Sequence, residues 1–318
     1  MKTLNEPYSR LSMRRRYEVW FLRLGLADGS GAWWFRYLLL NPGRGGCPAD
    51  PQGYPAQVWA TWFPREGKPQ TWIQGFPLKD LHLSPPGASP FRLEMGENLI
   101  TENECHGAME TGGRRVTWDL RYSSSFQVNL SSMGWIGFSR TPHSNALFSG
   151  QIALDDCLFR GEPLAYGMQG HNCGYRHRSF WTWTHLHFPG AQSAGSTFEA
   201  LVYDLPLGLF FRKAVLWHKG QIHTFRNFRE DLRDPCELTW RLRGSASSGL
   251  QVEVEIRGRE GLVHRLPYLK TDCSGEFEVA NDSLARARIV LLHPSGTREE
   301  LTTDTGAVLE MAGKRGAR

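Results

Sequence analysis

Apolar and polar residues alternate in many short runs along the chain. Apolar side chains occupy every second position in 116–122, 126–130, 238–242 and 252–256. Each run is bounded by Gly, Ser, Asp or Pro, which favour turns. A period of two predicts half-buried strands of antiparallel sheets. The best candidate for a helix is a short one near 227–233, ending before Pro235.

Two hairpins are expected from the turn residues between apolar runs. The segments 17–26 and 32–40 flank an Ala-Asp-Gly-Ser-Gly loop. Farther along, 214–218 and 221–225 flank the pair Lys219-Gly220. A glycine in a two-residue loop supplies the positive φ that such a turn requires.

The order of these elements repeats with an offset of about half the chain. A Trp-rich strand, a Gly/Ser loop and further aromatic strands occupy 17–76, and a similar succession occupies 180–228. Repetition of this kind indicates two β-rich units of the same plan, although two unrelated all-β halves could also look alike. We expect one domain over 1–165 and a second over 166–318.

The composition supports an all-β protein and excludes some classes of binding partner. The 318 residues include 34 Gly and 18 Pro, with 12 Trp, 17 Phe and 9 Tyr, a combination typical of many turns and short strands. The 37 Lys and Arg exceed the 32 Asp and Glu by five. The basic residues are dispersed, so we expect no nucleic-acid partner. No apolar run reaches the roughly 18 residues of a membrane span, which leaves only peripheral membrane contact open.

The cysteine spacing and the first seven residues indicate the cellular compartment of the protein. The six cysteines are scattered without a C-x-x-C pair, which fits reduced thiols better than disulfides or a zinc site. Residues 1–7 lack the apolar core of a signal peptide. We therefore expect a cytoplasmic protein, without a cofactor or a metal.

The segment Gly167–His177 is the most informative stretch for chemistry. It contains His171 and Asn172 between closely spaced glycines, which let a backbone turn sharply or approach a neighbour. It can be interpreted as a functional loop at a domain junction or as a structural linker with ordinary hydrogen bonds.

The strand expected at 181–188 strengthens the functional interpretation. Its alternation places Trp181, Trp183, His185 and His187 on one face. Two indoles and two imidazoles make a poor packed core but a suitable wall for a mostly apolar cavity. A metal bound by two of the histidines is the weaker interpretation, because no carboxylate stands at a fixed spacing.

Glu110 and Asp119 are the candidate acids of the first half. Glu110 lies in a Gly-punctuated segment and Asp119 within an alternating strand. The adjacent pair Asp155-Asp156 fits a solvated turn better. Neither Gly-x-Ser-x-Gly nor a phosphate-binding Gly-rich loop is present, which disfavours serine hydrolase and nucleotide chemistry.

Several short motifs together resemble one family. The opening Tyr17–Phe21, the strand Trp181–Trp183 and the segment 149–156 resemble the two-domain lipocalin-like (calycin) superfamily of carotenoid 1,2-hydratases (hydroxyneurosporene synthases) and tocopherol cyclases. Gly170–Gly174 is similar to its His-Asn-Trp-Gly motif, with Cys173 in place of Trp. The resemblance implies two lipocalin-like antiparallel barrels or sandwiches in tandem, with few helices. It also implies a long unsaturated or isoprenoid ligand that is hydrated or cyclised.

The expected mechanism combines the residues with this resemblance. An acid protonates a double bond, aromatic faces stabilise the cation, and a positioned water or an internal nucleophile captures it. The catalytic candidates are Glu110, Asp119, His171, Asn172 and His185. The expected ligand-binding residues, inside the barrels, are Trp20, Trp34, Tyr37, Met168, Trp181, Trp183 and His187. Two alternatives remain, a non-catalytic carrier of an apolar ligand and a glycan-binding β protein with exposed tryptophans.

Overall fold

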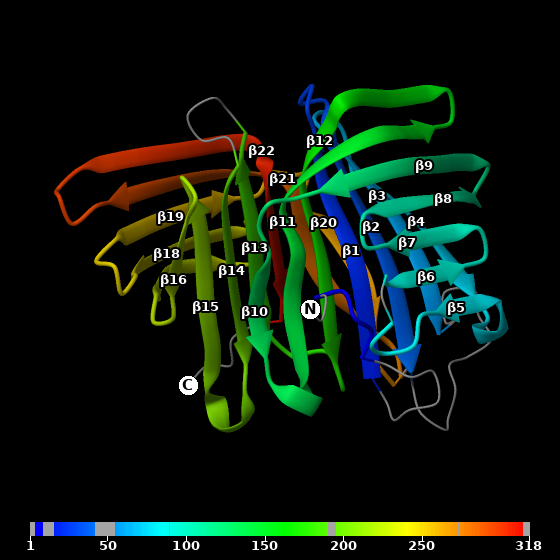
Figure 1. The fold of residues 1–318 in the computed structure, drawn as a ribbon, viewed down its shortest axis with the longest axis horizontal. Coiled ribbons are helices and arrows are strands. Elements are labelled where there is room, and N and C mark those ends of the chain that lie inside the picture. Colours follow the sequence, from blue (N-terminus) through cyan, green and yellow to red (C-terminus); the bar gives the residue numbers. More distant parts are fainter. Residues whose placement is uncertain are drawn as a thin grey trace.

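The computed structural model describes residues 4–8, 16–41, 55–88, 90–189, 195–272 and 274–313. Across these residues the chain is almost entirely β-structure, as the alternation predicted (Figure 1). The helical structure in these ranges consists of three single 3₁₀ turns. They are η3 (Leu78–Asp80), η4 (Gly134–Ile136) and η5 (Pro206–Gly208).

The first sheet contains twelve antiparallel strands in the order β4-β3-β2-β1-β12-β11-β9-β8-β7-β6-β5, with β10 paired to β11. Contacts of β4 with β8 and of β3 with β6 bring its two ends together into a nearly closed barrel. Its strands are β1 (Arg16–Leu26), β2 (Gly31–Asn41), β3 (Ala56–Pro64), β4 (Gln70–Phe76), β5 (Leu81–Leu83), β6 (Arg92–Met95), β7 (Asn98–Thr101), β8 (Glu104–Thr111), β9 (Arg114–Ser123), β10 (Val128–Ser132), β11 (Gly137–Leu154) and β12 (Cys157–Gly174).

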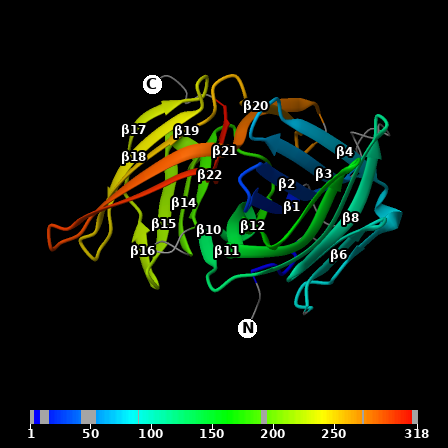
Figure 2. The ribbon, with the colours of Figure 1, turned by 90° about the horizontal axis from the view of Figure 1, so that it is seen from above.

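The second sheet contains ten antiparallel strands in the order β16-β15-β14-β13-β22-β21-β19-β18-β17, with β20 paired to β21. Seen from above, the two sheets curl around separate interiors (Figure 2). The strands are β13 (Trp181–Phe188), β14 (Ser196–Asp204), β15 (Phe210–His218), β16 (Gln221–Phe225), β17 (Arg229–Asp234), β18 (Thr239–Ser245), β19 (Gln251–Arg257), β20 (His264–Leu269), β21 (Glu276–Leu292) and β22 (Arg298–Ala312).

The two sheets repeat one topology, which confirms the predicted repetition. Strands β1–β4 occupy the places that β13–β16 occupy in the second sheet, and β12 and β11 correspond to β22 and β21. Even the side branch recurs, because β10 pairs with β11 as β20 pairs with β21. Both predicted hairpins are present, and Lys219 and Gly220 have φ values of 48° and 77° in the second.

Two sequence predictions about local structure are wrong. The short helix expected near 227–233 is instead largely strand β17, whose backbone pairs with β18. A helix this short is only marginally stable by itself, so the pairing with a neighbouring strand prevails. The expected loop at Gly167–His177 is instead largely part of β12, which continues to Gly174.

The glycines of β12 explain why this segment looked like a loop. A Cβ at Gly170 would lie 2.3 Å from the ring of Phe21, and one at Gly167 would lie 1.9 Å from the carbonyl oxygen of Arg23. Both contacts are far below van der Waals distance, so these glycines allow β12 to approach β1 closely. Their role is close strand packing rather than a turn.

Large apolar side chains fill the interior of each curled sheet. Trp20, Trp33 and Phe35 belong to the core of the first sheet, and Trp240 and Phe198 to that of the second. A third apolar cluster, which includes Phe21, Trp34 and Trp183, lies between the sheets. The cavity described below lies beside this third cluster. The expectation of a ligand cavity inside the barrels is therefore replaced by a cavity between them.

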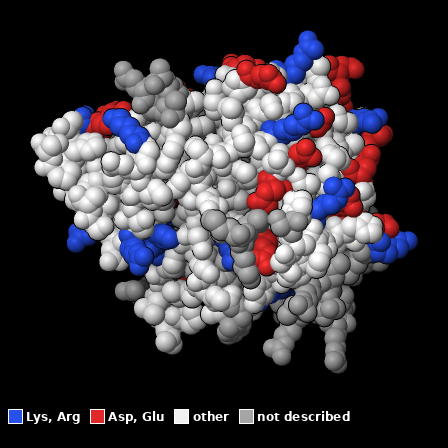
Figure 3. Space-filling view, viewed as in Figure 1, with Lys and Arg blue, Asp and Glu red and all other residues white. Residues whose placement is uncertain are grey.

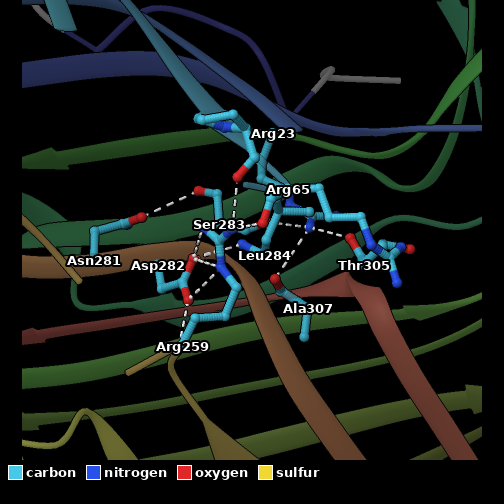
Figure 4. A network of polar contacts seen from close by, with 10 residues as sticks. Arg23, Arg65, Arg259, Asn281, Asp282, Ser283, Leu284, Thr305 and Ala307 are labelled. Atoms are coloured by element: carbon cyan, nitrogen blue, oxygen red, sulfur yellow. Dashed lines mark hydrogen bonds and ion pairs between the residues drawn. The ribbon is translucent and has the colours of Figure 1, made fainter. Parts of the chain in front are cut away.

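Polar contacts also join the sheets. Arg23 of β1 is fully buried, and its Nη2 donates to the carbonyl oxygens of Ser283, Thr305 (2.6 Å) and Ala307 (3.0 Å) on β21 and β22 (Figure 4). Burial lowers the pKa of this guanidinium to about 9. In the opposite direction, Arg259 of the second half donates from Nη1 to the carbonyl oxygen of Pro64 (2.6 Å).

The carboxylate of Asp282 holds Arg259 in this position. It accepts hydrogen bonds from the Arg259 backbone N–H (2.7 Å), from Nη2 (2.9 Å) and from the Leu284 N–H (2.9 Å). Asp282 itself is fully buried. A buried charge requires such partners, and here they attach the second sheet to the end of β3.

The surface provides no single-signed patch on the face shown in Figure 3, where Lys and Arg lie among Asp and Glu. Among the described residues, no helix has the length and apolar character to cross a membrane.

Candidate active site

A cavity of about 130 Å³ lies between the two sheets. Its walls come from β1, β2, β10, β11 and β12 on one side and from β13, β14, β20 and β22 on the other. The apolar part of the wall contains Val19, Phe21, Trp34, Trp183 and Leu201. A mostly apolar cavity with a few polar groups is typical of a small-molecule site.

Glu310 is the only carboxylic acid among the described residues that line the cavity. Its oxygens accept hydrogen bonds from Trp181 Nε1 (2.8 Å), the Tyr268 hydroxyl (3.0 Å) and Asn281 Nδ2 (3.3 Å). Burial raises the pKa of this carboxyl above its usual value, although Arg36 and these donors oppose the shift. The raised pKa enlarges the fraction of Glu310 that can donate a proton near neutral pH.

Arg36 is the buried cation of the same cavity. Its guanidinium carbon lies 3.9 Å from the ring centroid of Tyr268, 4.7 Å from that of Trp59 and 5.4 Å from that of Trp34. Such ring faces attract a cation and also fix its orientation. Nη1 has no hydrogen-bond partner within the described structure.

His177 and Tyr17 form another part of the wall. Their rings stack with centroids 4.1 Å apart, and His177 Nδ1 lies 3.2 Å from Thr271 Oγ1. Burial, with a contribution from Arg36, lowers the pKa of His177 to about 3. The imidazole is therefore neutral at physiological pH and can only exchange hydrogen bonds there.

The structure separates His171 from Asn172, which are neighbours on β12 but lie on opposite faces. Asn172 lines the cavity, and its Oδ1 has no partner among the described residues. His171 instead lies in the first barrel, stacked on Trp20 at 4.5 Å. Its Nε2 is 2.8 Å from Glu18 Oε1 and its Nδ1 is 2.8 Å from the carbonyl oxygen of Leu4. Both imidazole nitrogens are thus occupied away from the cavity.

His185 and His187 lie between the sheets but do not line the cavity. His185 Nε2 is 2.7 Å from the carbonyl oxygen of Ser144, and the His187 ring packs edge-on against Tyr166. Burial lowers the pKa of His185 to about 3 and that of His187 to about 4. Met168 is also buried in this interface outside the cavity.

The remaining predicted residues are farther from the site. Trp20 and Tyr37 belong to the core of the first barrel. Glu110 and Asp119 are solvent-exposed on β8 and β9. Neither carboxyl lines the cavity, and their catalytic role stays a prediction. Of the predicted ligand-binding residues, the cavity wall contains Trp34, Trp181 and Trp183.

The sequence reasoning missed Arg36, Glu310, His177, Tyr203 and Tyr268, all of which line the cavity. Two of these had a recognisable signal. Arg36 stands alone in the aromatic and aliphatic run 33–40, and Glu310 stands alone in the apolar run 306–312. A single charge inside a buried strand requires a partner or a function.

Cys173, which replaces the Trp of the family motif, also lies in the cavity wall. Of the eleven tryptophans whose side chains the structure describes, nine are buried, whereas a glycan-binding surface needs them exposed. Within the described residues, no group of three His, Cys, Asp or Glu side chains is arranged to hold a metal ion.

A second buried glutamate lies close to the cavity without lining it. Glu199 of β14 accepts hydrogen bonds from Trp183 Nε1 (3.0 Å) and from Thr141 Oγ1 of the first sheet (2.8 and 2.9 Å). Burial raises the pKa of Glu199 to about 7.

The fold and the cavity define an all-β protein with a lipocalin-like fold of two curled antiparallel sheets and a mostly apolar cavity between them. Among solved structures, it is similar to CghA with Sch210972 (TM-score 0.65, 11% identity, covering 95% of this chain and 90% of that one). It is also similar to kievitone hydratase from Nectria haematococca (TM-score 0.58, 12% identity, covering 100% and 94%). An AttH-type protein from Nitrosomonas europaea matches with a TM-score of 0.52 at 11% identity, covering 96% and 94%.

These similarities extend over nearly the whole chain and show the shared fold, the one that the sequence motifs indicated. No family model and no curated protein sequence matches the chain.

Proposed function

We propose that this protein is a hydratase- or cyclase-type enzyme that acts on an unsaturated, largely apolar molecule bound between the two barrels. The observation that carries the proposal is Glu310, a buried carboxyl with a raised pKa in the wall of an aromatic cavity. The shared fold with kievitone hydratase supports this class of reaction. A polyene or isoprenoid substrate, as the sequence resemblance implies, fits the apolar wall.

In the proposed reaction, Glu310 supplies the proton. As its O–H bond breaks, a C–H bond forms at one carbon of the substrate double bond, and the π electrons move into that bond. The other carbon becomes a cation. The faces of Trp34 and Trp183, both in the cavity wall, stabilise this charge. A dry cavity also protects the cation from bulk solvent.

Two routes complete the reaction, and both return the proton. In hydration, a water oxygen bonds to the cationic carbon and its extra proton passes to the Glu310 carboxylate. The free Oδ1 of Asn172 can accept a hydrogen bond from that water and orient it. In cyclisation, a second double bond of the substrate attacks the cation, and a proton lost from carbon returns to Glu310.

A non-catalytic carrier is the second candidate function. The observation that favours it is the occupancy of Glu310, whose oxygens already accept three hydrogen bonds from protein donors. A carboxyl held in this way can serve packing alone. We also infer a cytoplasmic location, because the four cysteines within the described residues are all free thiols.

The test is a comparison of wild type with Glu310→Gln in water labelled with heavy oxygen or with deuterium. Kievitone, geranylgeraniol and a linear carotene serve as probes, and mass spectrometry detects the products. We expect labelled water to add to a probe, or an isomer to form with one deuterium. The Glu310→Gln variant should lose at least about a hundredfold in rate, because its amide cannot donate the acid proton.

The matched control is Glu278→Gln, which makes the same change at an exposed position of β21. It should keep the wild-type rate. An unchanged rate in Glu310→Gln would rule out the proposed acid. If wild type binds the probes tightly but releases all of them unlabelled and unchanged, the protein is a carrier instead.

A further inference from the structure

The cavity carries more positive than negative charge. Three arginines line it, Arg36, Arg176 and Arg178, against the single carboxyl of Glu310. Arg176 is exposed and Arg178 is half-buried, with its guanidinium carbon 5.1 Å from the ring centroid of Tyr203. Arginines at a cavity opening attract anions, so the charge distribution favours a negatively charged ligand.

Arg36 is the deepest of these cations and has an unused donor. Its exposed fraction is only 5%, so water has little access to its guanidinium. Nη1 nevertheless meets no acceptor in the described part of the chain. A buried donor without an acceptor is costly, and in native proteins such a group usually has a partner. Because Arg36 lines the cavity, a bound molecule can supply that acceptor.

Glu310 lies in the same cavity wall but is not this acceptor, since no hydrogen bond joins it to Nη1. Tyr268 lies against both charges: its ring lies 3.9 Å from the Arg36 guanidinium carbon, and its hydroxyl donates to Glu310 at 3.0 Å. One aromatic side chain therefore separates the free cation from the candidate acid. The arrangement provides two subsites, one for an anion and one for the reacting bond.

We infer that the substrate carries a carboxylate, which Arg36 binds, on the same molecule as the double bond that Glu310 protonates. This inference rests on the proposed function and specifies its substrate as an unsaturated apolar acid. Guanidinium and carboxylate are complementary in shape and charge, and their hydrogen bonds are among the strongest in proteins. Binding the acid group at Arg36 fixes which double bond lies beside Glu310.

The probes for the test are farnesoic acid and its methyl ester, which share one unsaturated chain and differ in charge. Titration calorimetry with wild type, Arg36→Gln and Arg36→Lys measures each dissociation constant. We expect wild type to bind the acid roughly tenfold to hundredfold more tightly than the ester. Arg36→Gln should lose this preference and keep its affinity for the ester, and Arg36→Lys should retain part of it.

The matched control is Arg265→Gln on β20, where an exposed arginine pairs with Glu278 at 2.7 Å. It should bind both probes as wild type does. Equal affinity of wild type for acid and ester would overturn the inference. An Arg36→Gln variant that loses affinity for both probes to the same extent would also overturn it. These results leave the role of Glu310 standing. Conversely, suppose that Glu310→Gln leaves the reaction rate unchanged while the protein still binds the acid more tightly than the ester. This result would refute the proposed reaction and leave the carboxylate inference standing.

Discussion

Two glutamates flank β13, and each accepts a hydrogen bond from a tryptophan of that strand. Trp181 donates to Glu310 on β22, and Trp183 donates to Glu199 on β14. Both carboxyls are buried and have raised pKa values. They differ in what lies on the other side: Glu199 meets Thr141 of the first sheet, whereas Glu310 faces the cavity.

The arginines between the sheets show the same contrast. Arg259 directs Nε, Nη1 and Nη2 to oxygen acceptors, while Arg36 keeps Nη1 free beside the cavity. The Arg259 guanidinium is matched by acceptors, whereas Arg36, which lines the cavity, has an unpaired donor. Burial alone therefore does not distinguish a structural charge from a functional one. The two arginines differ in their access to the cavity, which Arg36 lines and Arg259 does not.

The largest expected effect is at the Arg259 contacts. Asp282→Ala should lower the free energy of unfolding by about 3–5 kcal/mol, because it leaves the half-buried Arg259 without its anionic partner. Denaturant titration measures the change. Asp231→Ala, which removes the partner of the exposed Arg243, should cost less than about 1 kcal/mol. Similar losses in both variants would contradict the contrast between the Arg259 and Arg243 ion pairs.

A second effect concerns pH and Glu199. Its pKa is about 7 in the folded protein against an ordinary value of 4.5. Between these values the folded carboxyl keeps a proton that the unfolded chain releases, so this group makes stability fall as pH rises. The contribution amounts to about 3 kcal/mol across the window. Glu199→Gln should remove it, as measured by denaturant titration between pH 4.5 and 7.5.

The difference between variant and wild type is the relevant quantity in that experiment. His177, His185 and His187 have lowered pKa values, so their charging in the unfolded chain gives stability the opposite slope. That slope is common to both proteins and cancels. Glu278→Gln at an exposed position serves as the control. A pH dependence unchanged by Glu199→Gln would show that Glu199 titrates normally.

The smallest effect is expected at Arg36. Arg36→Gln should change the free energy of unfolding by no more than about 1 kcal/mol, since the lost ring contacts are offset by removal of a buried charge with a free donor. Thermal unfolding of the ligand-free protein measures it. A loss as large as that of Asp282→Ala would assign Arg36 to the structural framework.

The alternating pattern predicted the strands well because it depends on local chemistry. Val116, Trp118, Leu120 and Tyr122 were expected on one face of a strand, and all four are buried along β9. The shared face of Trp181 and Trp183 is likewise confirmed, since both line the cavity. Only one face of such a strand meets the core, so a period of two in the sequence suffices to identify the strand.

The candidate site was harder to predict because strands between the barrels are buried on both faces. Along β1, Trp20 belongs to the core of the first barrel and Phe21 to the cluster between the barrels. Alternation cannot tell which apolar face points inward. His171 was grouped with Asn172 because their segment was interpreted as a loop, whereas on β12 they face opposite sides. Arg36 and Glu310 are 274 positions apart, and only the tertiary fold brings them to one cavity.

The repeated topology makes the shape of the cavity depend on how the two sheets pack against each other. Because its walls belong to both copies, neither half possesses a complete pocket, and the packing of one sheet against the other sets its shape. We therefore expect changes at the Arg23 and Arg259 contacts to alter the cavity while every residue of its wall stays the same.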